Sequence, residues 1–126
     1  MLKSSSDRIT HHISLGRQGE RIAAEYLKKR GWRIAECNFR AGRGEIDCIA
    51  WDGDVLVFVE VKTRKSKRYG APIEAITFHK QSVLRRTAEA YLVQHEYINV
   101  ACRFDVIEVM VTEDDVPRVT YWRNAF

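Results

Sequence analysis

The sequence predicts one α/β domain in which a central mixed β-sheet carries a helix on each face. Two segments have apolar residues at helical spacing, and five shorter segments have the composition of strands. The segment 55–62 is apolar on both sides, with valines at 57, 59 and 61 on one face and Leu56 and Phe58 on the other. Such a strand belongs in the middle of a covered sheet, and the two helices supply the covers.

The first helix is predicted over 15–30, within a single domain spanning 14–126. Residues 1–13 are small, polar and without period, which is typical of a flexible tail. Ser14 can cap the helix and Gly31 can end it. Its apolar stripe consists of Leu15, Ile22, Ala23, Tyr26 and Leu27.

Three strands follow the first helix. Segment 32–39 alternates as a strand, residues 40–43 form a loop, and 44–51 and 55–62 form a hairpin. The turn lies at Asp52-Gly53-Asp54, a strong hairpin signal.

The second half begins with a polar loop over 63–70. Thr77 can cap a second helix over 78–96, which is followed by strands at 100–111 and 118–122. We expect this helix to direct Phe78, Val83, Leu84, Ala88, Tyr91 and Leu92 inward.

Composition favours a globular protein of a reducing compartment. Hydrophobic residues make up 45% and charged residues 30% of the chain. No run approaches the roughly 18 apolar residues of a membrane span, and the N-terminus has no apolar signal-peptide core. Three cysteines without CxxC spacing, Cys37, Cys48 and Cys102, are expected to be buried free thiols. A cytoplasmic location and no membrane partner follow as expectations.

The charge distribution points toward a polyanion. The net charge is +4 and the pI is about 9.1, which alone is a weak indication. Basic residues gather around the hairpin: Arg40, Arg43, Lys62, Arg64, Lys65, Lys67, Arg68, Arg85 and Arg86. A solvated basic face explains such a run equally well before its neighbours are considered.

Three charges interrupt the apolar hairpin near one end. Side chains alternate along a strand, so Glu60 and Lys62 share a face. A turn centred on 53–54 pairs Asp47 directly with Glu60, and one centred on 52–53 sets them diagonally. Either register brings the three groups together with Glu45 close by, whereas a three-residue loop without a bulge would separate them.

Two explanations compete for these charges. Cross-strand ion pairs would contribute only about 0.2–1 kcal/mol, which is a weak reason for charge in a covered strand. Two carboxylates beside a lysine suit a Mg²⁺ site for phosphoryl chemistry, because hard oxygen ligands hold the ion. The pattern therefore favours the metal site over the ion pairs.

Four stretches between Gly16 and about Val109 have a recognisable pattern: "GRQGERIAAEYLKKRGWRIAECNFRAGRGEIDCIAWDGDVLVFVEVKTR", "HKQ", "AEAYL" and "RFDVIEV". In these stretches the sequence resembles the bacterial YraN family of endonuclease-like proteins. That family is similar to the PD-(D/E)XK nuclease superfamily and to archaeal Holliday-junction resolvases. The resemblance implies a restriction-endonuclease-like fold with the element order α-β-β-β-α-β-β.

The resemblance also implies roles for particular residues. Asp47, Glu60 and Lys62 match the motif's aspartate, (D/E) and lysine, although Ile46 stands where the motif has proline. Glu20 matches an acidic residue of the first helix, and Gln81 a polar position of the second. Mg²⁺ or Mn²⁺ would be held by Asp47, Glu60, the Val61 carbonyl and Glu20.

The resulting hypothesis is a metal-dependent endonuclease acting on branched or duplex DNA, with a homodimer as a possible assembly. Contacts to DNA are expected from Arg40, Arg43, Arg64, Lys65, Lys67, Arg68 and Lys80. Two alternatives stay open: a nucleic-acid-binding module whose inherited site does not cut, and an interaction domain that docks an acidic protein through its charged face.

Overall fold

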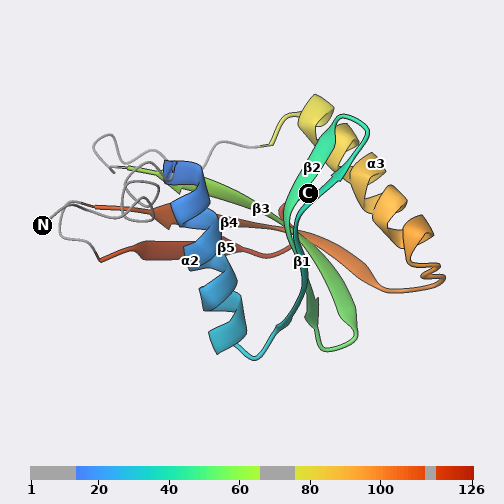
Figure 1. Cartoon of the computed structure of the whole chain (residues 1–126), viewed down its shortest axis with the longest axis horizontal. Helices are drawn as coiled ribbons and strands as arrows, with labels where there is room; N and C mark the ends of the chain where they lie inside the picture. The colour runs from blue at the N-terminus through green and yellow to red at the C-terminus, as the bar shows by residue number, and fades with distance from the viewer. Residues whose placement is uncertain (1–13, 66–75, 113–115) are drawn as a thin grey trace, which may run out of the picture.

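The computed structural model describes residues 14–65, 76–112 and 116–126. The predicted tail at 1–13 and the predicted DNA contacts Lys67 and Arg68 lie outside these residues. Seven elements follow one another in the predicted order (Figure 1): α2 (Leu15–Lys29), β1 (Arg33–Ala41), β2 (Gly44–Asp52), β3 (Val55–Arg64), α3 (Phe78–Gln94), β4 (Cys102–Met110) and β5 (Arg118–Trp122).

The five strands form one mixed sheet in the order β1-β2-β3-β4-β5. Strands β3 and β4 are parallel, and the other neighbours are antiparallel. Helix α3 makes the crossover that a parallel pair requires. The doubly apolar strand β3 therefore occupies the centre of the sheet, as predicted.

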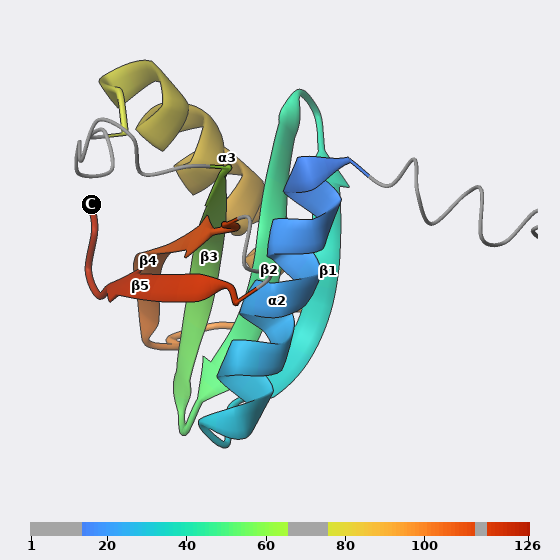
Figure 2. The ribbon, with the colours of Figure 1, turned by 90° about the vertical axis from the view of Figure 1, so that its left-hand side faces the viewer.

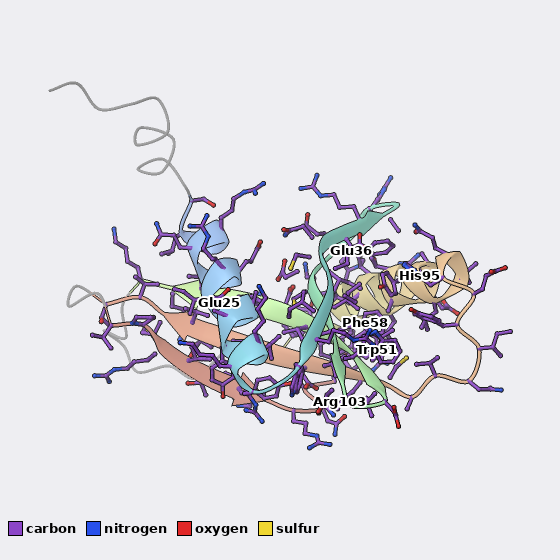
Figure 3. All side chains as sticks on the ribbon, turned by 60° about the horizontal axis from the view of Figure 1, so that its bottom comes forward. Glu25, Glu36, Trp51, Phe58, His95 and Arg103 are labelled. Carbon is purple, nitrogen blue, oxygen red and sulfur yellow. The ribbon has the colours of Figure 1, made fainter. Side chains whose placement is uncertain are left out.

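One helix covers each face of the sheet (Figure 2). Beneath α2, Ala23 and Leu27 pack with Val57 and Val59 of β3. On the other side, Leu84 and Tyr91 of α3 pack with Phe58. Figure 3 shows Phe58 and Trp51 on the α3 side, near His95 from the end of that helix. The predicted two-sided burial of β3 is thus confirmed.

Capping explains where the helices begin. The Ser14 hydroxyl accepts a hydrogen bond from Arg17 N at 3.2 Å, and the Thr77 hydroxyl accepts one from Lys80 N at 3.1 Å. Gly31 lies just beyond α2 with φ +86°, a conformation that favours glycine. The predicted caps are all in place.

One predicted core residue is wrong. Phe78 is the first residue of α3 and is 87% exposed. Side chains in a first helical turn have no preceding turn to pack over, so helical spacing is a poor guide to burial there.

Several predicted boundaries also shift. Arg40 belongs to β1 and not to a loop, since only Gly42 and Arg43 separate β1 from β2. Strand β3 continues through Arg64, because β4 pairs with it as far as Arg64↔Met110. Helix α3 ends at Gln94, two residues earlier than predicted.

The cysteines only partly match expectation. All three are free thiols on strands, but Cys37 and Cys102 are exposed and only Cys48 is buried. Cys37 lies on the edge strand β1, and Cys102 begins β4, so neither is enclosed as a residue of a central strand would be. None of the described helices is long and apolar enough to cross a membrane.

A buried polar network ties β5 and the residues after it to the sheet. Asp105 of β4 is 0% exposed and accepts hydrogen bonds from Arg103 Nε (3.0 Å), Asn124 N (2.9 Å) and the Tyr121 hydroxyl. Arg103, labelled in Figure 3, also pairs with Asp52 at 3.1 Å, so the network reaches the β2–β3 turn. Such full satisfaction is what allows these charges to be buried.

Candidate active site at the fork between β2 and β3

The β2–β3 turn has two residues, Gly53 and Asp54, with Asp52 paired to Val55. The paired residues run as far as Cys48↔Val59, and the same register continued by one residue sets Asp47 opposite Glu60. Of the two registers predicted from the sequence, this is the one that pairs Asp47 directly with Glu60. Beyond that point Val61 N donates its hydrogen bond to the Asp47 carboxylate, at 2.8 Å from Oδ2. The Asp47 carboxylate thus accepts the hydrogen bond that a backbone carbonyl of β2 would accept if the two strands were still paired at this position.

Glu60 lies on the α3 face of the central strand. Its side chain is nearly buried, with 7% of the residue exposed. Lys80, from the first turn of α3, reaches it with Nζ 3.5 Å from Oε2. Lys80 was predicted as a DNA contact, and in the structure it also supplies positive charge to a buried carboxylate.

The surroundings of Asp47 make its ionised form unfavourable. Burial is the main cause, followed by a hydrogen bond and repulsion from Glu60; Glu20 adds further repulsion, and the Val61 N–H opposes these effects. Together they raise the pKa of Asp47 to about 8, from an ordinary value of 3.8. Among the described residues, no cation forms an ion pair with this carboxyl group.

Glu20 reaches the same place from α2 because that helix packs very closely on β3. Gly19 is the contact residue: a Cβ built on it would lie 1.8 Å from Thr63 Oγ1. Asn38 of β1 then donates to Glu20 Oε1 at 2.8 Å. Asn38 has a left-handed backbone (φ 54°), which asparagine tolerates better than most residues.

Three carboxylates converge as a result. One oxygen each from Glu20, Glu45 and Asp47 lies within 4.8 Å of the other two. Sequence reasoning placed Glu45 nearby but did not name it as a ligand. The signal was present, because Glu45 and Asp47 are two residues apart on one strand and so share a face.

This donor set fits a hard divalent cation. Carboxylate oxygens are the ligands that Mg²⁺ prefers, and Mg²⁺ commonly keeps waters alongside one or two carboxylates. The raised pKa of Asp47, which burial and the neighbouring Glu60 and Glu20 cause, accords with such a site, since a bound cation would favour the ionised form. The residues present therefore suit Mg²⁺ or Mn²⁺.

The other predicted catalytic residues differ in how they are placed. Lys62 follows Glu60 by two positions on the same face of β3 and is half-buried. Gln81 donates its side-chain amide to the Ile76 carbonyl at 2.8 Å, so this group supports the chain entering α3. No catalytic part is evident for Gln81 in this arrangement.

The predicted basic contacts fall into two groups. Arg40 pairs with Glu45 at 2.5 Å and Arg64 with Glu108 at 3.4 Å, so both hold carboxylates of the protein itself. Arg43, at the tip of the β1–β2 hairpin, and Lys65, just after β3, are exposed. Those two are the better placed of the described set to meet a ligand.

Fold and site together define a small mixed α/β protein of restriction-endonuclease-like fold. Its carboxylates and a lysine gather where the pairing of β2 with β3 ends. The chain belongs to the uncharacterised protein family UPF0102, whose family model matches residues 19–109. The predicted membership of the YraN family is thereby confirmed.

Relatives from several bacteria resemble the chain over about nine tenths of its length. A UPF0102 protein of Alkaliphilus metalliredigens is 47% identical over 113 residues, covering 90% of this chain and 97% of the relative. One from Symbiobacterium thermophilum is 50% identical, covering 89% and 95%. One from Geobacter sulfurreducens is 44% identical, covering 92% and 91%. The names of these relatives state the family and give no activity.

Proposed function

We propose that this protein is a metal-dependent endonuclease that hydrolyses phosphodiester bonds in DNA. The observation that carries the proposal is the Asp47 carboxylate, held by Val61 N–H beside Glu60 and Glu20 with its pKa raised to about 8. A structural carboxylate would be paired with a cation, as Asp105 is with Arg103. A group kept uncompensated in a cluster of like charge is a candidate for function.

The residues that would hold the cation are Asp47, Glu60, Glu20 and the Val61 carbonyl, with Glu45 as a further carboxylate. When bound, Mg²⁺ or Mn²⁺ supplies Lewis-acid polarisation of the phosphate and a more acidic water. Asn38 would keep one Glu20 oxygen oriented by its 2.8 Å hydrogen bond. Lys80 would hold Glu60 in place from α3.

Lys62 has a separate part in the proposal. Lys62 shares the face of β3 with Glu60, and its ammonium group would meet a phosphate or a nucleophilic water. A positive charge there would stabilise the negative charge that develops on the phosphate as the bond breaks. Arg43 and Lys65 would contact flanking phosphates. These roles suit a cytoplasmic protein that acts on branched or duplex DNA. The proposal includes a homodimer as a possible assembly.

A cleavage assay tests the proposal. Labelled single-stranded, linear duplex, flap and four-way DNA are incubated with the protein in Mg²⁺, Mn²⁺ or EDTA. We expect metal-dependent cleavage by the wild type, and its loss in Glu60→Gln. The matched control is Glu25→Gln on α2, an exposed carboxylate that pairs with Lys28 at 3.5 Å, and it should cut like the wild type.

Two results would contradict the proposal. If the wild type binds DNA but cuts none of these substrates with either metal, the protein is better explained as a nucleic-acid-binding module with a silent site. If it neither binds nor cuts nucleic acid, the interaction domain with a charged face becomes the preferred explanation.

A further inference from the structure

A groove of about 590 Å³ lies between the tip of the β1–β2 hairpin and α3. In Figure 1 the β1–β2 hairpin lies alongside α3. The two elements touch where Gly44 meets Thr87, since a Cβ on Gly44 would lie 1.8 Å from Thr87 Oγ1. Beside this contact, the small residues Ala41, Gly42 and Ala90 leave the groove open.

The groove is positively charged. Arg43 comes from the hairpin tip, and His79 and Arg86 come from one face of α3. Among the described residues that line the groove, none is acidic. Guanidinium groups beside small residues suit a phosphate backbone, because the small residues permit close approach and arginine binds phosphate through paired donors.

The dimensions of the groove suit one sugar-phosphate chain. The groove follows α3 from His79 to Ala90, or about 16 Å at roughly 1.5 Å per residue. Spread over that length, 590 Å³ corresponds to a mean cross-section of about 36 Å², or roughly 6 Å across. One sugar-phosphate chain matches such a groove in width, whereas a duplex, whose major groove alone is about 12 Å wide, can present only one of its two backbones to it.

An exposed aromatic ring lies in the first turn of α3, about 100° around the helix axis from the groove-lining His79. Phe78 immediately precedes His79 and is 87% exposed in the first turn of α3. An aromatic ring beside cationic side chains is the combination that binds unpaired bases by stacking. A fully paired duplex has its base faces covered and gains little from such a ring.

Chain connectivity links the groove to the candidate active site along α3, where His79 precedes Lys80, which contacts Glu60. On the hairpin, Gly44 faces α3, so the next residue, Glu45, points to the opposite face of the sheet, where Glu20 lies. We infer that the groove binds one unpaired nucleic-acid strand and directs it toward Glu60, with a base stacked on Phe78. The inference rests on the proposed nuclease function and narrows its substrate to nucleic acid containing an unpaired strand.

Fluorescence anisotropy in EDTA tests this inference without cleavage. The probes are a labelled single strand of about 12 nucleotides, long enough to span the footprint of one small binding domain, and the matching blunt duplex. We expect the wild type to prefer the single strand. The double variant Arg43→Gln/Arg86→Gln should bind it at least about tenfold more weakly at low salt, and its slope of log K against log salt should fall by about 1.4, at roughly 0.7 per lost phosphate contact.

Three further variants sharpen the test. Ala90→Glu places a negative charge in the groove and should also weaken single-strand binding. Phe78→Ala should weaken it about tenfold, by loss of one stacked base, with little effect on the duplex. The controls are Arg21→Gln/Lys29→Gln on the exposed surface of α2 and Val93→Ala, an exposed apolar residue near the far end of α3. Circular dichroism confirms that each variant is folded.

The outcomes separate this inference from the proposed function. If folded groove variants bind the single strand as the wild type does, or if the wild type prefers the duplex, the inference is wrong, and metal-dependent cleavage could still stand. If the groove variants lose binding but the wild type never cuts, the inference holds and the nuclease proposal fails. A wild type that binds no nucleic acid overturns both.

Discussion

Gly19 of α2 and Thr63 of β3 are in direct contact, with no room between them for a side chain. A Cβ on Gly19 would lie 1.8 Å from Thr63 Oγ1 and 2.8 Å from both Thr63 Cβ and Cγ2. Thr63 is short and β-branched, so it cannot swing aside as a long side chain would. This contact fixes the height of α2 above the sheet and with it the position of Glu20.

Gly19→Ala should therefore destabilise the protein by about 1–3 kcal/mol, the usual range for overpacking. Gly16→Ala is the matched control in the same helix, since its Cβ would meet only Ser14 Oγ at 4.0 Å. That change should stabilise by up to about 1 kcal/mol through helix propensity. Urea unfolding measures both. Equal effects of the two substitutions would show that the contact with Thr63 does not constrain α2.

The pKa of Asp47 predicts how stability depends on pH in the absence of metal. The folded state raises the pKa of Asp47 from 3.8 to about 8, so folding favours the protonated form. The stabilisation associated with that proton is fully present below the unfolded pKa of 3.8 and is lost as the pH rises toward 8. The amide in the Asp47→Asn variant has no such proton to lose. This variant should therefore become increasingly more stable than the wild type as the pH rises from about 5 to about 8.

The measurement is the melting temperature of both proteins in EDTA across this pH range. A difference of about 1 kcal/mol corresponds to roughly 4 °C for a chain of this size. Titrating groups that do not interact with Asp47 are common to both proteins and largely cancel in the comparison. Parallel curves would mean that Asp47 ionises in the folded protein as readily as in the unfolded chain.

Divalent metal should reverse this penalty. A ligand that binds only the folded state stabilises it by mass action, by about 2.7 kcal/mol at roughly one hundred times its dissociation constant. We expect millimolar Mn²⁺ to raise the wild-type melting temperature by several degrees at a pH of about 8, the folded pKa of Asp47. Asp47→Asn should abolish the rise and Glu25→Gln should keep it. An equal rise in the wild type and Asp47→Asn would place the metal elsewhere.

The buried Asp105 network should be a major source of stability. Asp105→Ala leaves the Arg103 guanidinium, which is 6% exposed, without its buried partner, and breaking such a pair costs about 3–5 kcal/mol. Tyr121→Phe removes one donor to Asp105 and should cost about 1–2 kcal/mol. Glu89→Ala on the exposed face of α3 is the control, with an expected effect within about 0.5 kcal/mol. Urea unfolding ranks the three; a ranking that puts Asp105→Ala near the control would contradict a structural role for the network.

Periodicity predicted the fold well where burial is complete. Strand β3 is apolar at every position from Val55 to Val59, and only the centre of a covered sheet accommodates that pattern. Periodicity gave wrong predictions of burial at the end of a helix and on an edge strand. Phe78 has helical spacing but no turn above it to pack against, and Cys37 alternates correctly on a strand whose outer edge is open.

The part of the candidate site that lies on the β2–β3 hairpin could be predicted from the sequence. The short turn at Gly53-Asp54 set the register that brings Asp47 opposite Glu60. The contributions of Asn38 and Lys80 were harder to predict, because they arise from the packing of separate elements. Arg103 and Asp105 are two residues apart on β4 and share a face, but the burial of this pair was hard to predict, because its Tyr121 and Asn124 donors come from β5 and the residues after it.

Lys62 separates binding from chemistry in the proposed nuclease. It lies two residues beyond Glu60 on the same face of β3, and its ammonium group offers no lone pair to a metal ion while it is charged. Its loss should leave metal and DNA binding intact while removing charge stabilisation confined to the transition state. Lys62→Ala should therefore bind DNA and Mn²⁺ like the wild type, yet cut at least about a hundredfold more slowly at saturating substrate. Lys65→Ala, in the exposed segment after β3, is the control, and it should raise KM and lower the salt dependence of binding while sparing kcat. A Lys62→Ala variant that cuts at the wild-type rate would show that the reaction occurs without this lysine, and the activity would then have to belong to another site.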